Sequence, residues 1–398
     1  MLTDRFTPIP LANTNAFKPI EIGETHLLHR VVMGPLTRMR ATCPGNVPNT
    51  QWTEEYYSQR SQRPGTMIIT ESVAVSPQGA GYDHAPGVWS AEQMTVWSRI
   101  FQRIHDNGCF VWGQLIYLGR QASIKVLTRE GLRYVSASNG VYKSPEDKAE
   151  ALRLNNPQHG LTLAEIKTVV SDYVAAARNM IACGADGVEV HAAHGYLLSQ
   201  FQDPISNHRT DDYGGSIENR ARLTLEIVDA VVEAVGAAHV GIRFSPWNTY
   251  GTMSGSSDPT LLATYAYMIG ELEKRRRAGK GIAYIQMTEP LLNDNWQKNP
   301  SEQAAKPHRN LESNAFVYSI WKGPIIRTGE LGDNPEIAKR LVEDDRTLLG
   351  YGKYFISTPD LVDRLEKGLP FNKYKKDLFY AQTDKGYIDY PTYEQATK

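Results

Sequence analysis

Cysteine, net charge and long apolar runs are all scarce in this sequence of 398 residues. The three cysteines, Cys43, Cys109 and Cys183, are far apart and odd in number, which excludes a disulfide framework and a paired-cysteine metal site. A net charge of −1 provides no basic surplus for nucleic acid or an anionic membrane. No apolar run has the length of a membrane span, and the first residues show no apolar signal core. We therefore expect a cytoplasmic protein.

Short apolar segments alternate with amphipathic helical patterns along the chain. The segments are nearly continuous in apolar residues, as expected for strands that are buried on both faces. Eight strands, each followed by a helical stretch, predict an α/β fold, a (β/α)8 TIM barrel that forms one domain over residues 1–398. The strands are expected at Arg30–Met33, Thr66–Thr70, Phe110–Leu115, Gly187–His191, Val240–Phe244, Ile282–Thr288, Pro324–Arg327 and Leu348–Tyr351.

Helices and insertions are expected between these strands. The clearest helical pattern is Asn219–Val235, with Ser216 as its N-cap. Uneven spacing predicts two large loop insertions, at Gly119–Gly160 and Glu289–Asn314, and the aromatic C-terminal tail is expected to pack back on the barrel. Further helices are predicted at Leu163–Cys183, Pro259–Arg275 and Pro335–Leu341.

Two histidines and a tyrosine leave the end of the fourth predicted strand together, where barrels carry their functional residues. His191 and His194 have three possible roles: metal ligands, buried structural histidines, or hydrogen-bond donors to a ligand. No carboxylate or cysteine stands at ligand spacing, so we expect no metal. The nearby phenol favours the donor role, and Tyr196 is suited to act as a general acid.

Polar residues at other strand ends predict a cofactor site. Thr37, Gln114 and Arg243 have donors suited to the polar edge of a flavin, although Gln114 and Arg243 could instead cap the barrel mouth structurally. The glycine-containing turns after the last two strands are typical of phosphate binding, with Lys353 as counter-charge. The residues expected to bind the cofactor are Pro35, Thr37, Ser72, Gln114, Arg243, Gly329, Gly352 and Lys353.

Motifs along nearly the whole chain resemble the Old Yellow Enzyme family of flavin-dependent ene-reductases, especially its fungal branch. The resemblance implies FMN, bound non-covalently at the barrel mouth, and an NADPH dehydrogenase activity. The motifs lie at Phe17–Ile20, His29–Arg40, Gln62–Glu71, Tyr82–Trp89, Phe201–Pro204, Glu218–Arg222, Phe316–Pro324, Asp360–Pro370 and Gly386–Pro391.

The same resemblance implies a ping-pong reaction. A hydride passes from NAD(P)H to flavin N5 and then to an activated alkene, an α,β-unsaturated carbonyl or nitro compound. His191 and His194 would hold the substrate oxygen, while Tyr196 would donate the proton. A homodimer is also expected. The substrate pocket is assigned to Tyr82, Ile116, Tyr250, Trp296 and Tyr380.

Four departures from the family pattern bear on specificity. His194 stands where many relatives carry Asn, and Lys353 stands where relatives often carry Arg. Ile116 replaces a bulky Trp of close relatives, which should open the pocket. Tyr250 and Trp296 stand where those relatives carry Phe. Two alternatives stay open: a metal-dependent barrel hydrolase or lyase, and a flavin-binding protein without turnover.

Overall fold

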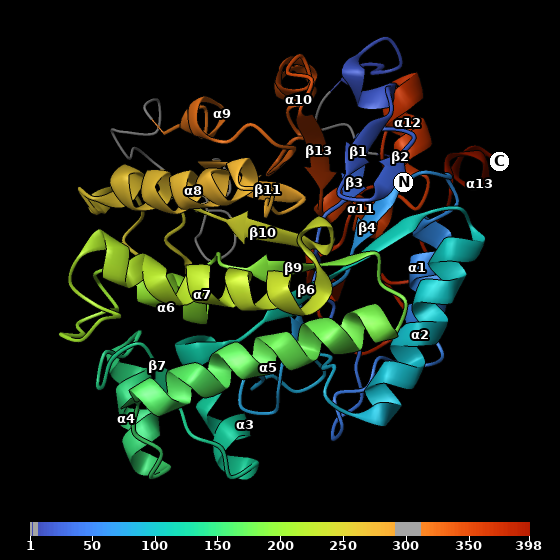
Figure 1. Cartoon of the computed structure of the whole chain (residues 1–398). Coiled ribbons are helices and arrows are strands. Elements are labelled where there is room, and N and C mark those ends of the chain that lie inside the picture. The colour runs from blue at the N-terminus through green and yellow to red at the C-terminus, as the bar shows by residue number, and fades with distance from the viewer. Residues whose placement is uncertain (1, 3–6, 291–311) are drawn as a thin grey trace.

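Eight parallel strands close into a barrel in the computed structural model, which describes residue 2, residues 7–290 and residues 312–398 (Figure 1). The barrel strands are β3 (Val31–Met33), β4 (Met67–Ile69), β6 (Phe110–Ile116), β9 (Gly187–His191), β10 (Val240–Phe244), β11 (Tyr284–Thr288), β12 (Ile325–Thr328) and β13 (Thr347–Tyr351). They pair in the order β4-β3-β13-β12-β11-β10-β9-β6, and β4 pairs with β6 to complete the ring. The predicted barrel is confirmed, and each strand end lies within two residues of its expected position.

Amphipathic helices cover the outside of the barrel. Figure 1 shows α5 (Leu163–Ala182), α7 (Ile217–Val235) and α8 (Leu261–Arg277) side by side over β6, β9 and β10. Helix α7 starts two residues before the predicted position, and the Ser216 hydroxyl caps it by accepting from the Asn219 N–H at 3.2 Å. Other helices are α1 (Thr53–Arg60), α2 (Ala91–Asp106), α6 (Leu197–Gln202), α10 (Pro335–Leu341) and α12 (Leu361–Lys367). No helix in the described ranges is long and apolar enough to cross a membrane.

An apolar plug, built around Trp112 and Tyr284, fills the barrel at the N-terminal ends of its strands. The two rings contact edge to face with centroids 5.0 Å apart. Gly187 and Gly241 make room for them, because a Cβ there would lie 2.5 Å from the Trp112 ring and 2.3 Å from the Tyr284 ring. The hairpin of β1 (Ile20–Ile22) and β2 (Thr25–Leu27) packs Ile22 and Leu27 onto the plug and closes this end.

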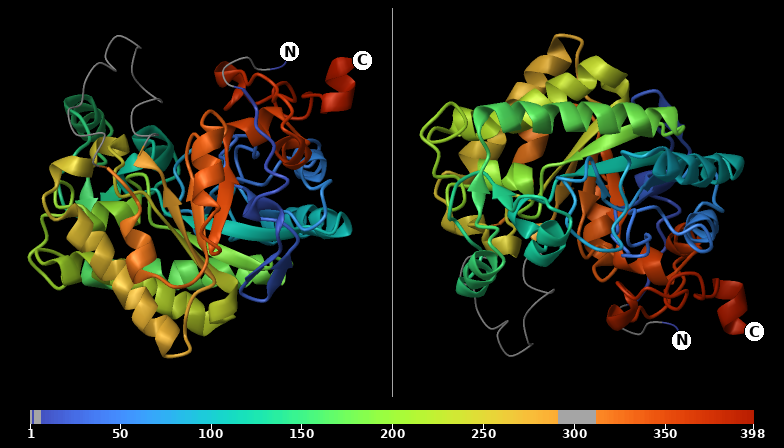
Figure 2. Two further views of the ribbon diagram at one scale, coloured as in Figure 1. Left: turned by 90° about the horizontal axis from the view of Figure 1, so that it is seen from above. Right: turned by 90° about the horizontal axis from the view of Figure 1, so that it is seen from below.

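The first predicted insertion folds into a small lobe after β6. It contains α3 (Ile124–Arg129), β7 (Val135–Ser136), α4 (Pro145–Arg153) and β8 (His159–Gly160), which gather at one corner of the molecule (Figures 1 and 2). Strands β7 and β8 pair with each other rather than with the barrel. Residues 291–311, most of the second predicted insertion, lie outside the described residues.

Two buried arginines hold the C-terminal tail against the barrel mouth. Arg38 donates to the carbonyl oxygens of Phe379 and Gly386 at 3.2 and 2.8 Å. Arg40 donates to the carbonyl oxygen of Thr383 at 2.8 Å. The expectation that the aromatic tail packs back is confirmed, since the side chains of Phe371, Phe379 and Tyr387 are buried. The tail thereby becomes one wall of the space above the barrel.

Candidate active site

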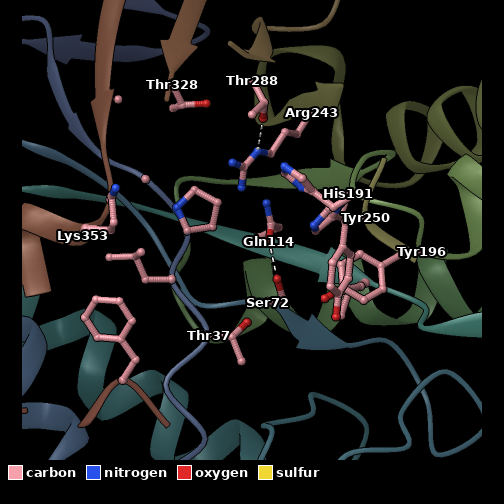
Figure 3. Close-up of a pocket in the computed structure, with 18 of the residues that line it drawn as sticks. Thr37, Ser72, Gln114, His191, Tyr196, Arg243, Tyr250, Thr288, Thr328 and Lys353 are labelled. Atoms are coloured by element: carbon pink, nitrogen blue, oxygen red, sulfur yellow. Dashed lines mark hydrogen bonds between the residues drawn. The ribbon is translucent and has the colours of Figure 1, made fainter. Parts of the chain in front are cut away.

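A cavity of about 760 Å³ opens at the C-terminal ends of the barrel strands, at the end opposite the apolar plug. Every site residue predicted within the described ranges lines it, whereas Trp296 lies outside the described residues. The lining includes Pro35, Thr37, Ser72, Tyr82, Gln114, Ile116, His191, His194, Tyr196, Arg243, Tyr250, Gly329, Gly352, Lys353 and Tyr380. Figure 3 shows Lys353 at one side, Gln114 and Arg243 in the middle, and His191 with Tyr196 at the other side.

The two predicted donor histidines and the tyrosine form one cluster of rings. The His191 ring lies 5.5 Å from that of His194 and 5.1 Å from that of Tyr196, both in edge-on contact. The Nδ1 atom of His191 accepts from the Ala193 N–H at 3.2 Å, so a neutral ring carries its proton on Nε2 and can donate to a ligand. His194 has a positive φ of 54°, and its backbone N–H donates to the Ser245 hydroxyl at 2.7 Å.

The surroundings keep this cluster uncharged. Burial, followed by the nearby Arg243, lowers the pKa of both His191 and His194 well below its ordinary value. Burial also raises the pKa of the Tyr196 phenol far above its ordinary value. Two neutral imidazoles and a protonated phenol can therefore donate hydrogen bonds at neutral pH, and the phenol keeps a proton to transfer.

Gln114 and Arg243 present nitrogen donors at the centre of the cavity. The Gln114 amide oxygen accepts from the Ser72 hydroxyl at 2.5 Å, and its nitrogen donates to Glu189 at 2.7 Å (Figure 3). The Nε atom of Arg243 donates to the Thr288 hydroxyl at 3.3 Å. Among the described residues, no protein group accepts from the two terminal nitrogens of Arg243, which line the cavity.

The glycine turns after β12 and β13 lie next to each other, as predicted. Thr328 and Gly350 are partners in the strand register, and a Cβ on Gly350 would come 2.1 Å from the Thr328 methyl group. The Lys353 ammonium lies 3.7 Å from Asp333 and 4.0 Å from Glu330. The sequence predicted no role for these two carboxylates, and a phosphate at this end would share Lys353 with them.

Aromatic and apolar side chains form the walls beside the histidine cluster. The Tyr82 hydroxyl donates to the Gln121 carbonyl oxygen at 2.7 Å, and the Tyr250 ring lies 6.5 Å from that of Tyr196. Ile116, at the end of β6, lines the same side of the cavity. Tyr380 comes from the anchored tail and is 46% exposed, so it borders the opening.

The sequence predicted no role for two buried polar residues beneath the cavity. Glu189 and Gln286 lie inside the barrel, in strands β9 and β11, and both are fully buried. A signal existed, because each is polar within an apolar strand. Glu189 also lies two residues before His191, and therefore on the same face of β9.

Comparisons with known proteins agree with the geometry. A family model described as "NADH:flavin oxidoreductase / NADH oxidase family" matches residues 15–372. The chain belongs to this family. It is 57% identical to "Enoate reductase 1" of Kluyveromyces lactis over 98% of this chain and 97% of the relative. It is 39% identical to a "Probable NADPH dehydrogenase" of Candida albicans, over 99% and 95% of the two chains.

The solved structures agree as well. The crystal structure of Old Yellow Enzyme from Pichia sp. AKU4542 matches with a TM-score of 0.88 and 39% identity, covering 96% of this chain and 95% of that one. The resemblance to the Old Yellow Enzyme family is therefore confirmed, and the protein is an FMN-dependent oxidoreductase of this family.

Proposed function

We propose that this protein is an ene-reductase that uses NAD(P)H to reduce the C=C bond of α,β-unsaturated carbonyl or nitro compounds. The observation that carries the proposal is the convergence of His191, His194 and Tyr196 on the same cavity as Gln114 and Arg243. The name of the K. lactis relative, an enoate reductase, supports the same activity.

The chain's donor set suits FMN held non-covalently. The terminal nitrogens of Arg243, which have no acceptor in the part of the chain that the structure describes, match the polar edge of a flavin ring. The fixed amide of Gln114 matches the same edge, and Thr37 lines the same cavity. Gly329, Gly352 and Lys353 suit a phosphate at the other end, since two glycine turns and a cation line the cavity there. The chemistry that bound FMN supplies is the relay of a hydride from the nicotinamide to the β-carbon of the alkene.

His191 and His194 hold the oxygen of the substrate's carbonyl or nitro group. Neutral imidazole donors stabilise the negative charge that develops on this oxygen during hydride addition. Tyr196 then gives its proton to the α-carbon, which completes the saturated product. Because a single cavity receives the nicotinamide and the alkene in turn, we expect ping-pong kinetics.

The first experiment is a visible spectrum of the purified protein, followed by NADPH oxidation with cyclohexenone under nitrogen. A flavin spectrum and enone-dependent oxidation would support the proposal. Bound flavin without turnover would favour the non-catalytic alternative, and a colourless protein with bound metal would favour the hydrolase or lyase. The described residues give that last alternative little support, since they contain no group of three metal-ligating side chains.

Location and assembly are part of the same proposal. We propose a cytoplasmic location and, from the family resemblance, a homodimer. Sedimentation of the purified protein measures its oligomeric state directly.

A further inference from the structure

Glu189 is a buried carboxylate directly beneath the candidate active site. It points into the barrel from β9, two residues before His191, and its exposed fraction is 0%. In the strand register it faces Gln114 on β6 and Gly241 on β10. It therefore lies between the apolar plug and the cavity, at a depth where an unpartnered charge would be costly.

Two glutamines satisfy the Glu189 carboxylate. Gln114 donates to its Oε1 at 2.7 Å. With its amide nitrogen turned towards the carboxylate, Gln286 donates to Oε1 at 3.0 Å and to Oε2 at 2.6 Å. The Gln114 amide is held in one orientation, because its oxygen accepts from Ser72 and one of its N–H groups donates to Glu189. Its second N–H group remains available to a ligand.

The positive charge of Arg243 acts on this carboxylate. Arg243 lies on β10, beside His191 and Gln286 in the register. Burial raises the pKa of the Glu189 carboxyl to about 7, while Arg243, Gln114 and Tyr284 act in the opposite direction. Of the other groups around it, His191 is neutral, and the Tyr284 phenol keeps its proton because burial raises its pKa.

We propose that Glu189 is a positioning residue of the cofactor site: it orients Gln114, and its charge behind Arg243 governs how much more tightly the site holds reduced than oxidised flavin. The inference rests on the proposed function. Reduced flavin carries negative charge near N1, where an Arg stabilises it. A carboxylate behind that Arg weakens its field in the cavity, so removal of the carboxylate charge should favour the reduced cofactor.

The test is Glu189→Gln, measured as the midpoint potential of the holoenzyme by dithionite titration against a reference dye. Glutamine retains an oxygen that can accept from Gln114, so the change removes the charge and preserves the hydrogen bond. At pH 8.5 we expect at least a tenfold rise in the ratio of reduced to oxidised cofactor affinity, which is about 30 mV for two electrons. At pH 6 the wild-type carboxyl is protonated, and the difference should become small.

Glu273→Gln is the matched control. Glu273 is a buried carboxylate on α8 that pairs with Arg276 and Arg277, away from the cavity. This variant should match the wild type at both pH values. Equal potentials of Glu189→Gln and wild type at pH 8.5, or a shift of equal size at both pH values, would overturn the proposed role.

A second measurement, made on the wild type, tests the role of Glu189 if the Glu189→Gln variant loses FMN or does not fold. In the wild type, reduction of oxidised flavin to its anion takes two electrons from dithionite and one proton. When the flavin is reduced just above pH 7, Glu189 takes up a second proton from water. The midpoint potential should therefore fall more steeply with pH just above pH 7 than near pH 9. A constant one proton per two electrons from pH 6 to 9 would overturn the role. Absence of bound FMN, or of enone reduction, would instead refute the proposed function.

Discussion

The side-chain nitrogen of Gln121 donates to the carbonyl oxygen of Gly195 at 3.1 Å. Gln121 belongs to the lobe inserted after β6, whereas Gly195 lies in the turn that leads to Tyr196. Gly195 has a φ of 70°, and a Cβ there would come 2.5 Å from the carbonyl oxygen of Tyr250. Three segments that are distant in the sequence therefore fix where the Tyr196 ring enters the cavity.

Tyr196→Phe should separate the two halves of the reaction. We expect flavin reduction by NADPH to stay near the wild-type rate, because no proton from Tyr196 is needed there. Enone reduction should slow by about 10²- to 10⁴-fold, the usual contribution of a general acid. Stopped-flow absorbance of the flavin measures both steps. Tyr213→Phe is the control, since it loses a hydroxyl that donates to Glu226 away from the cavity. Unchanged enone turnover in Tyr196→Phe would exclude Tyr196 as the proton donor.

The histidine pair can be tested without turnover. A phenolate ligand stacked on oxidised flavin gives a charge-transfer band, and His191 and His194 are expected to donate to its oxygen. The double variant His191→Leu/His194→Leu should lose the band at ligand concentrations that saturate the wild type. His194→Asn retains a donor and should keep the band. If the band persists in the double variant, another group holds the ligand oxygen.

The sequence predicted the strand ends well, because a continuous apolar segment and the polar residues that end it are local properties of the sequence. His191 and Arg243, for example, were assigned to adjacent strand ends, and they are partners in the register. The pairing of Gln114 with Glu189 was not predictable, since it depends on the relative height of strands whose first residues are 77 positions apart (110 and 187). The proximity of Lys353 to Asp333 depends on the shape of a loop, which no periodicity describes.

Lys353→Met should weaken FMN binding. A charge-assisted hydrogen bond to phosphate contributes about 1.5–3 kcal/mol, so we expect a Kd for FMN roughly 10- to 100-fold higher. Lys353→Arg should bind at least as tightly as the wild type, because a guanidinium can contact phosphate in a bidentate manner. Fluorescence quenching of FMN added to apoprotein gives both values. Lys125→Met, on the exposed face of α3, serves as the control; equal affinities of Lys353→Met and control would place the phosphate elsewhere.

Ile116→Trp should change the face of the alkene that receives the hydride. The indole would occupy space next to Tyr82 and Tyr196 that Ile116 leaves open. We expect altered enantiomer ratios for at least some bulky enones, measured by chiral gas chromatography, while small enones keep their ratio. Identical ratios across a panel of 2- and 3-substituted enones would argue against control of the facial preference by this residue.

Glu71 predicts a dependence of stability on pH. Burial raises the pKa of its carboxyl from 4.5 to about 7, so the folded state keeps this proton to a higher pH than the unfolded state does. The resulting stabilisation is complete below about pH 4.5 and is lost as the pH rises through 7. Glu71→Gln should therefore gain free energy of unfolding relative to wild type between pH 5 and 8, on the order of a few kcal/mol.

Denaturant titrations at the two pH values measure this gain. Glu273→Gln is again the control, because hydrogen bonding to Arg276 holds the pKa of Glu273 at about 2 and its contribution is constant over this range. A pH-independent difference between Glu71→Gln and wild type would show that Glu71 ionises in the folded protein as it does in the unfolded chain.

The β1–β2 hairpin seals one end of the barrel with Ile22 and Leu27, and the cavity lies at the opposite end, at the barrel mouth. Under the proposed ping-pong kinetics, the nicotinamide and the enone occupy the cavity in turn. An enone in excess would occupy the place that the nicotinamide needs, and the rate should pass through a maximum and then decline as enone concentration rises. Additional NADPH should relieve that decline.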